Sequence, residues 1–260
     1  MGNEFPQILT EPIYANDTID GSKGEPLQGI FEQSATQKFR LGTKLVFPSL
    51  DKVFRYGKVG GTGLSKALMT TSPAMDAHFV DEAQATSYGN ATVGALEFLV
   101  DIATGSAVAE DALQDATMVV NKTDGIGDVY NIIANKLQSS DVLLRILLDS
   151  PIRTAWVAAT EITIAINKHR GVIVAPTTVS GVPAGVPLID MTTLYYGWFQ
   201  TRGYTPILPD SSTTLAVGEP VGIGGTAGMV DTAVTVKQVW GFCVYPPTHS
   251  ETAIIDLKLD

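Results

Sequence analysis

Residues 38–47 read Lys38-Phe39-Arg40-Leu41-Gly42-Thr43-Lys44-Leu45-Val46-Phe47 and carry the clearest indication of the fold class. Apolar residues and a β-branched threonine alternate there with charged residues or glycine, and this period of two is typical of a half-buried strand. A second run, Val53-Phe54-Arg55-Tyr56, follows it, and a glycine cluster at 57–63 closes that run. Because β-branched and aromatic residues favour the pleated backbone while glycine interrupts it, the stretch predicts two successive strands.

Short apolar runs of the same kind recur to the end of the chain, separated by turn residues. They lie at 96–102, 118–120, 142–148, 162–166, 172–175, 193–200, 205–208, 217–221, 239–244 and 254–259. Asp124-Gly125 stands between the run at 118–120 and residues 129–132, and both residues tolerate the positive φ of a hairpin turn. The expected fold is therefore mainly β, with β-sandwich or barrel domains and little helix.

Two segments remain ambiguous, because a short apolar run fits a strand and a buried helix equally well. Residues 129–138 could form a short helix, since Ile132, Ile133 and Leu137 follow helical spacing over barely three turns. Residues 142–148 carry apolar side chains on both faces around Arg145. That pattern favours a strand buried on both sides and leaves a helix as the alternative.

The N-terminal 37 residues differ from the rest of the chain, because they show no sustained period. They carry six acidic residues against one lysine, and three glycines and a proline between 21 and 29 interrupt any helix or strand. Such a segment cannot build a core of its own, so it is either disordered or laid along another surface. The spaced apolar residues favour an extended arm that docks on a neighbour, with these predicted partner contacts: Phe5, Ile8, Ile13, Tyr14, Ile30 and Phe31.

The predicted organisation has three parts: an extended N-terminal arm at 1–37, a central β domain at 38–190 and a small C-terminal β-barrel at 191–260. A chain of 260 residues with 45% hydrophobic content can bury one sizeable core or two smaller ones. Only 17% of the residues are charged, which suits faces that end up against other subunits.

Charge and patterning argue against several classes of partner. The formal net charge is −10, so nucleic acid, which needs lysine and arginine opposite its phosphates, is not an expected partner. The longest uncharged stretch, 171–189, contains three prolines and cannot form a regular membrane-spanning helix, so no membrane partner is expected. The first ten residues lack a basic region followed by an apolar run, so no signal peptide is expected.

No motif in the sequence frames a reactive group. The glycine cluster at 57–63 departs from the phosphate-loop and dinucleotide patterns and is interpreted as a turn at a strand end. Cys243 is the only cysteine, and its apolar neighbours predict burial. His78, His169 and His249 lie far apart in sequence, although distant residues can still converge in a fold. The sequence therefore predicts no catalytic, cofactor-binding or metal-binding residue and no enzymatic activity.

Two parts of the chain resemble virion proteins of tailed bacteriophages, particularly structural proteins common in marine phages. The first reads Asp51-Lys52-Val53-Phe54-Arg55-Tyr56-Gly57-Lys58. The second begins at 149–152 and continues through 171–178 and 181–187 to Tyr195-Tyr196-Gly197-Trp198-Phe199-Gln200-Thr201-Arg202-Gly203. The tail, at 215–221, 227–230 and 239–242, is similar to the small β-barrel of phage decoration proteins. The resemblance covers 49–60 and 149–244 well and the part between them loosely.

The resemblance implies a capsid decoration (cement) protein, a non-enzymatic structural component of the phage head. It implies a homotrimer seated on the outer surface of the capsid, with the major capsid protein and its own copies as partners. The implied location is the virion, after synthesis in the cytoplasm of the host bacterium, and no cofactor is implied.

Two alternatives stay open at this point. One is a head fibre or receptor-binding module in which Tyr195, Tyr196, Trp198 or Tyr204 contacts a cell-surface glycan, although aromatic residues that alternate within a strand more often belong to a core. The other is a hydrolytic virion enzyme, for which the sequence frames no acid, base or nucleophile.

Overall fold

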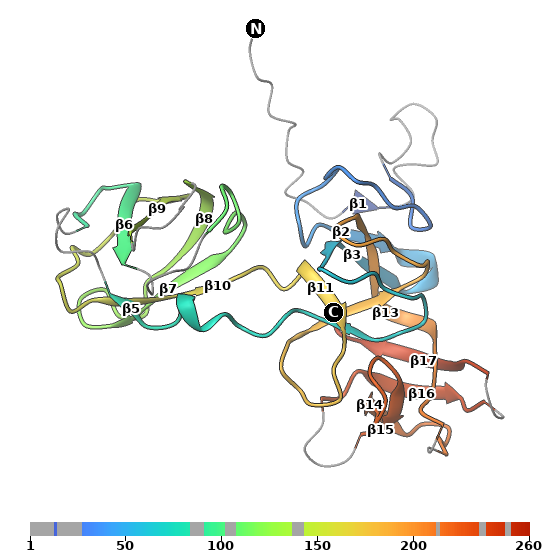
Figure 1. Cartoon of the computed structure of the whole chain (residues 1–260). Coiled ribbons are helices and arrows are strands. Elements are labelled where there is room, and N and C mark those ends of the chain that lie inside the picture. Colours follow the sequence, from blue (N-terminus) through green and yellow to red (C-terminus); the bar gives the residue numbers. More distant parts are fainter. Residues whose placement is uncertain are drawn as a thin grey trace, which may run out of the picture. The chain divides into compact units, whose positions relative to one another are not determined.

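The computed structural model describes residues 13–14, 28–83, 91–101, 108–136, 143–211, 214–233, 238–247 and 251–260. These residues fold mainly into strands, and helix is confined in them to two single turns, η2 (Pro48–Leu50) and η3 (Ala77–Phe79). The expectation of a mainly β fold with little helix is therefore confirmed. The chain divides into two compact units, one made of 1–74 with 168–260 and the other of 75–167 (Figure 1).

The first unit holds one sheet of eleven strands. In chain order they are β1 (Ile13–Tyr14), β2 (Lys44–Phe47), β3 (Lys52–Val59), β4 (Thr70–Thr71), β11 (Arg170–Val174), β12 (Pro183–Pro187), β13 (Tyr196–Ile207), β14 (Pro220–Ile223), β15 (Val230–Thr232), β16 (Gly241–Tyr245) and β17 (Ala253–Lys258). Five of them close a ring, because β3 pairs with β11, β11 with β4, β4 with β12, β12 with β13, and β13 again with β3. The sheet then extends from β3 to β2 and β1, and from β13 to β17, β16, β14 and β15.

The long strand β13 joins the cores of this unit. Its first half is buried on both faces. On one face Phe199 packs in an apolar cluster with residues from the ring of five strands, and on the other Trp198 packs with Tyr56 in a separate aromatic cluster. Its second half alternates between buried and exposed residues, and Ile207 packs in a third cluster around the buried Trp240. The ring and the C-terminal strands are thus parts of one structure.

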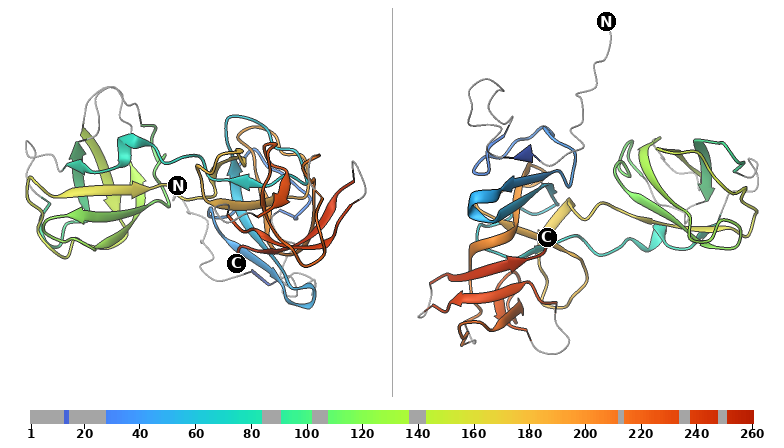
Figure 2. Two further views of the ribbon diagram at one scale, coloured as in Figure 1. Left: turned by 90° about the horizontal axis from the view of Figure 1, so that it is seen from below. Right: turned by 180° about the vertical axis from the view of Figure 1, so that it is seen from behind.

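The second unit is a smaller antiparallel sheet around a single core. Its six strands are β5 (Glu82–Ala83), β6 (Glu97–Asp101), β7 (Thr117–Lys122), β8 (Val129–Asn135), β9 (Leu143–Leu148) and β10 (Glu161–Ala165). Their order in space is β5-β10-β7-β8-β9-β6, and the end strands β5 and β6 also contact each other, so the sheet curls towards a closed barrel (Figure 2). Every second residue of β7, β9 and β10 points inward and packs with Trp156.

The structure decides the two ambiguous segments. Residues 129–135 form strand β8 instead of a helix, and β8 pairs with β7 across the predicted turn, where Gly125 has a φ of 85°. Residues 143–148 form strand β9, as expected. The expectation that this strand is buried on both sides is wrong, because Leu144, Ile146 and Leu148 fill the core while Arg145 on the other face is exposed.

The predicted boundary between residues 190 and 191 is corrected by the structure. It falls inside the first unit, because β12 and β13, on either side of it, are neighbours in one sheet. The segment predicted as a central domain, 38–190, contains parts of the first unit and the whole second unit, which is inserted between β4 and β11. Residues 191–260 accordingly form no separate barrel. An insertion leaves little trace in local patterns, since the strands that it separates pair only after the chain returns.

The predicted arm is also shorter than expected, because residues 28–37 belong to the first unit. Tyr56 Oη donates a hydrogen bond to Gln28 Oε1 at 2.6 Å, and Trp198 Nε1 donates to the carbonyl of the buried Gln28 at 3.0 Å. Ser34 forms an isolated β-bridge with Tyr196. The rest of the predicted arm, residues 1–27, lies outside the described residues except for β1, which pairs in parallel with β2.

Candidate functional site

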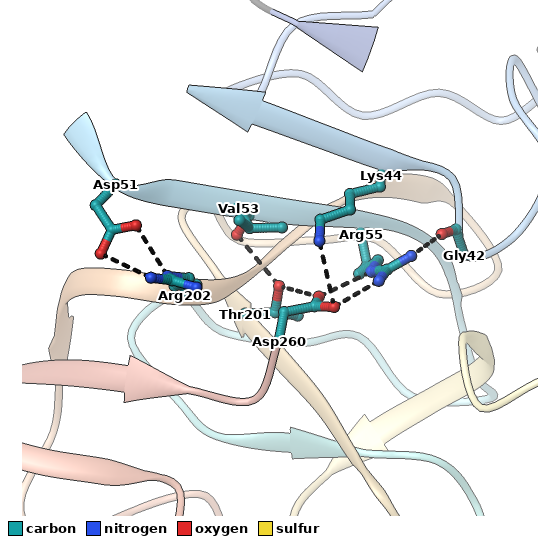
Figure 3. A network of polar contacts seen from close by, with 8 residues as sticks. All are labelled: Gly42, Lys44, Asp51, Val53, Arg55, Thr201, Arg202 and Asp260. Carbon is teal, nitrogen blue, oxygen red and sulfur yellow. Dashed lines mark hydrogen bonds and ion pairs between the residues drawn. The ribbon is translucent and has the colours of Figure 1, made fainter. Parts of the chain in front are cut away.

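A network of polar side chains surrounds Asp260, just after β17 (Figure 3). Arg55 Nε of β3 donates to Asp260 Oδ2 at 2.8 Å, the Nη2 group of the same arginine also donates to the carboxylate, and Thr201 Oγ1 of β13 donates to it at 2.8 Å. Lys44 Nζ of β2 lies 3.8 Å from the carboxylate. One carboxylate thus connects β2, β3 and β13 to the end of β17.

The neighbouring charges fix the ionisation of this network. Burial by itself would raise the pKa of Asp260, but hydrogen bonds from Arg55 and Thr201 and the charges of Arg55 and Lys44 outweigh it and lower that pKa to about 2. The hydrogen bond to Asp260 in turn raises the pKa of Arg55. Both partners are therefore charged at neutral pH, and the pair holds strands together instead of exchanging a proton as an acid–base pair would.

A surface hollow of about 270 Å³ lies beside the network. Its charged lining consists of Lys44, Asp51, Lys52 and Arg202, and its apolar lining consists of Val46, Phe47, Pro48 and Val53. Asp51 and Arg202 pair across it, with Arg202 Nε 2.9 Å from Asp51 Oδ1 and Nη2 donating to Oδ2 at 3.3 Å (Figure 3). We call this feature the basic hollow, because three of its four charged lining residues are cations.

Gly203 allows β13 to approach the corner that carries Asp51. Its φ is +84°, a backbone conformation that L side chains rarely adopt. A Cβ atom added there would lie 2.5 Å from the carbonyl oxygen of Asp51. Because that neighbour is backbone, no side-chain rotation relieves the clash, and the wall of the basic hollow depends on this glycine.

The substitution Gly203→Ala is therefore expected to lower the free energy of unfolding of the first unit by about 2–4 kcal/mol, since positive-φ strain and the clash act together. Urea denaturation followed by tryptophan fluorescence measures the change. Gly61→Ala is the matched control, because nothing lies within 4 Å of a Cβ at that exposed glycine, and its effect should stay within about 0.5 kcal/mol. Equal midpoints for the two variants would contradict this role of Gly203.

A second exposed feature covers the outward side of β13, β17 and β16. Tyr204 is 58% exposed, Phe242 43% and Tyr245 49%, and Ile254 is also exposed. The strand register arranges the outward residues in two rows, Tyr204-Asp256-Phe242 and Pro206-Ile254-Tyr245. We call Tyr204, Phe242, Tyr245 and Ile254 the aromatic face. Asp256 lies between Tyr204 and Phe242 and forms an ion pair with Lys258, so the exposed apolar side chains stand beside charged ones on this face. A group of exposed large apolar side chains rimmed by polar residues often marks an interaction site.

The two described histidines lie in different surroundings. His78 Nδ1 is 2.7 Å from Asp76 Oδ1 in an exposed turn, where Asp76 caps η3. His169 is buried, and its burial, with the positive charge of Lys168 nearby, lowers its pKa to about 3. His249 lies outside the described residues. In the described part of the chain, no group of three or more His, Cys, Asp or Glu side chains is placed to hold a metal ion.

One smaller prediction from the sequence is confirmed in full and another in part. Cys243 is buried, and burial raises the pKa of its thiol. In the glycine cluster at 57–63, the first three residues lie inside β3, and the chain leaves the strand only at Gly60 and bends at 61–62. A Cβ atom on Gly60 would lie 2.9 Å from the carbonyl oxygen of Gly171, so close approach of the β11 backbone explains a glycine at that position.

The six predicted partner contacts fall in different places. Phe5 and Ile8 lie outside the described residues. Ile13 and Tyr14 form β1, whose backbone pairs with β2 of the same chain. Ile30 is partly buried against the aromatic cluster of the first unit, whereas Phe31 is 66% exposed.

The four aromatic residues considered for glycan contact differ in how far they are buried. Trp198 is buried in the core, and Tyr196 is partly buried, with its ring stacked on Tyr56 at a centroid distance of 6.3 Å. Tyr195 is half-buried, and Tyr204 is exposed on the aromatic face.

Lys44, Lys52 and Arg55 belong to a mildly basic stretch of the sequence that is most simply interpreted as a solvated strand face, and nothing in that stretch predicts the basic hollow or the network around Asp260. Their residues come from segments near 44–55, 201–202 and 260, which no spacing rule connects. For the aromatic face, the sequence offered only the apolar residues Phe242 and Ile254 within predicted strands. Their outward position is known from the structure.

The described residues contain no apolar helix of membrane-spanning length. Comparison of the chain with protein-family models, with curated proteins and with solved structures finds no match.

Proposed function

We propose that the protein is a non-enzymatic structural component of a tailed-phage virion that binds the outer surface of the capsid and stabilises it. The observation that carries this proposal is the aromatic face, an exposed group of large apolar side chains on a rigid sheet. A surface of this kind suits persistent contact with another protein. The resemblance of 49–60 and 149–244 to phage decoration proteins supplies the identity of that partner, the major capsid protein.

The size of the aromatic face favours a protein that acts in many copies. Covering the exposed parts of three aromatic side chains removes on the order of 300–400 Å² from water, which contributes roughly 7–10 kcal/mol. Association itself costs about 4–15 kcal/mol, so one such contact is weak. A homotrimer would carry three such contacts. Once one of them has formed, the other two bind at a high effective concentration, which strengthens the attachment of the whole trimer.

The proposal includes no nucleic-acid, membrane or cofactor partner, and it places the protein on the virion after synthesis in the host cytoplasm. The net charge of −10 supports the first of these points, since an acidic body is repelled by packaged DNA.

The test is a sedimentation assay with expanded phage heads that lack this protein. The wild-type chain should sediment with the heads, and the double variant Tyr204→Ser with Phe242→Ser should bind at least ten-fold more weakly, because central aromatic residues dominate interface energies. Ile126→Ser is the matched control, since Ile126 is an exposed apolar residue of the second unit and its replacement should leave binding unchanged. Unchanged binding of the double variant, or no binding of the wild type, would contradict the proposal.

The second candidate function is a head fibre or receptor-binding module that contacts a cell-surface glycan. The specific observation in its favour is that Tyr204 and Phe242 stand in one exposed row. The burial of Trp198 weighs against it, because that residue cannot reach a ligand. A glycan array distinguishes the two functions, and so does copy number in purified particles: a number near that of the main shell subunit favours decoration, and a handful of copies favours a fibre.

A further inference from the structure

The basic hollow stands out against the charge of the whole chain. The protein carries 27 acidic and 17 basic residues, yet the hollow is lined by Lys44, Lys52 and Arg202 against the single acid Asp51. Arg55 adds a further cation beside it in the network around Asp260. A local excess of positive charge on an acidic protein attracts an anionic group to this place in particular.

The carboxylates near the hollow are already engaged by other cations. Asp51 contacts Arg202 through both of its oxygens, and Asp260 accepts hydrogen bonds from Arg55 and Thr201. Lys44 has only the 3.8 Å contact with Asp260, which is longer than a hydrogen bond. Within the described residues, Lys52 has no ion pair. Lys52 is therefore available to an anion from outside, and Lys44 beside it is engaged only by the longer contact with Asp260.

The apolar lining narrows the chemistry of that anion. Val46, Phe47, Pro48 and Val53 supply much of the wall. A bare inorganic anion gains nothing from such a wall, whereas a carboxylate on a methylene stem can place its stem against it. The wall also excludes water from one side, which strengthens the attraction between the lysines and a carboxylate. Glutamate in an extended segment meets both requirements.

One residue of the hollow, Arg202, lies close in sequence to Tyr204 of the aromatic face. Arg202 and Tyr204 are two residues apart on β13, and their partners in the register, Lys258 and Asp256, are likewise two apart on β17. Residues two apart on a strand point to the same side of the sheet. One extended segment can therefore reach the hollow with an acidic residue and the aromatic face with apolar residues.

We propose that the basic hollow binds a glutamate side chain from an acidic, apolar-flanked segment of the partner protein that covers the aromatic face. This inference rests on the proposed function for the existence of that partner. It adds the chemistry of the segment, in which a carboxylate contacts Lys44 and Lys52 and neighbouring apolar side chains contact the aromatic face. The charge complementarity also sets the position of the partner, since acidic surface elsewhere on this chain would repel the acidic segment of the partner.

The test uses the full chain and a capped synthetic peptide of alternating glutamate and leucine, with binding measured by isothermal titration calorimetry at low salt. The wild type should bind the peptide, and Lys52→Glu should weaken binding at least ten-fold. Lys66→Glu is the matched control, because it makes the same charge change at an exposed site of the first unit that does not line the hollow, and it should change binding less than two-fold. Lys52→Gln is a milder variant with the same expected direction, and thermal unfolding checks that each variant is folded.

Three results would overturn the inference. Equal weakening by Lys52→Glu and Lys66→Glu would indicate general charge attraction. Equal competition by inorganic phosphate or by a glutamine version of the peptide would remove the need for a carboxylate on a stem. Peptide binding only after removal of residues 1–12, which contain Glu4 and Glu11, would make the chain's own N-terminal segment the occupant. The sedimentation assay with the Tyr204 and Phe242 variants is independent of these measurements, so failure here leaves the proposed function standing.

Discussion

Replacement of Trp198 by alanine is expected to lower the free energy of unfolding of the first unit by about 3–5 kcal/mol. The side chain is 2% exposed and its ring lies 5.0 Å from Tyr56 and 5.2 Å from Phe39. Truncation leaves a large cavity between these rings, which the fixed strands β3 and β13 cannot close. It also removes the donor for the carbonyl of Gln28, and with it a bond that holds residues 28–34 on the unit.

Tyr204→Ala is the matched control for this prediction. The two residues stand on the same strand, but Tyr204 is 58% exposed, and its loss should change stability by less than about 0.5 kcal/mol. Differential scanning calorimetry measures the unfolding of both variants. Since both substitutions lie in the first unit, only the unfolding transition of that unit should shift. A loss below 1 kcal/mol for Trp198→Ala would show that the aromatic cluster is not a rigid core.

Acidification is expected to destabilise the first unit through the buried His169. Its pKa falls from 6.5 to about 3 in the folded chain, because burial disfavours the imidazolium and Lys168 and Arg55 add positive charge nearby. The unfolded state therefore takes up a proton near pH 6.5 while the folded state does not. The contribution of His169 to stability is complete above pH 6.5 and is lost progressively as the pH falls towards 3. The slope approaches about 1.4 kcal/mol per pH unit below pH 6.5, which amounts to roughly 2 kcal/mol between pH 6.5 and 4.5.

The measurement is urea denaturation at pH values from 7 to 4.5 for the wild type and for His169→Gln, which has no titrating side chain. The variant should lose most of the slope, whereas replacement of the exposed His78 by glutamine should retain it. The pH range ends at 4.5 so that Asp260 stays ionised in both the folded and the unfolded chain, since its pKa is 3.8 when unperturbed and about 2 in the folded chain. The stability that Asp260 contributes is present above pH 3.8 and is lost as the pH falls through 2, so it leaves this window flat. Identical slopes for the wild type and His169→Gln would contradict the prediction.

Local patterns predicted most of the longer strands, whereas β1, β4, β5, β12 and β15 fall outside the predicted runs. The run at 53–56 and the turn at Asp124-Gly125 depend on neighbours in sequence and appear in the structure at the expected places. Of the alternating stretch 38–47, only Lys44–Phe47 forms a strand, and the residues before it form no strand. The segment at 129–138 was harder, because its spacing satisfies a helix for only three turns. Pairing with β7 and β9 decided in favour of a strand, and that pairing is a tertiary contact.

The candidate sites were beyond such patterns. The carboxylate of Asp260 meets Arg55 across 205 positions in sequence, and Arg202 meets Asp51 across 151. Phe31 and Ile30 are adjacent and equally apolar, yet only Ile30 packs against the core, since only the fold determines which side chain turns inward.

Period, turn chemistry and composition act between near neighbours, so the amino-acid sequence was enough to predict a chain of short strands with an acidic charge. Only the folded chain shows that β3 and β13 close a ring, that 75–167 is inserted as a separate unit, and that Lys44, Lys52 and Arg202 line one hollow. The physical reason is that these features arise from pairing between strands far apart in the chain, and side chains share a surface only once that pairing has fixed the register.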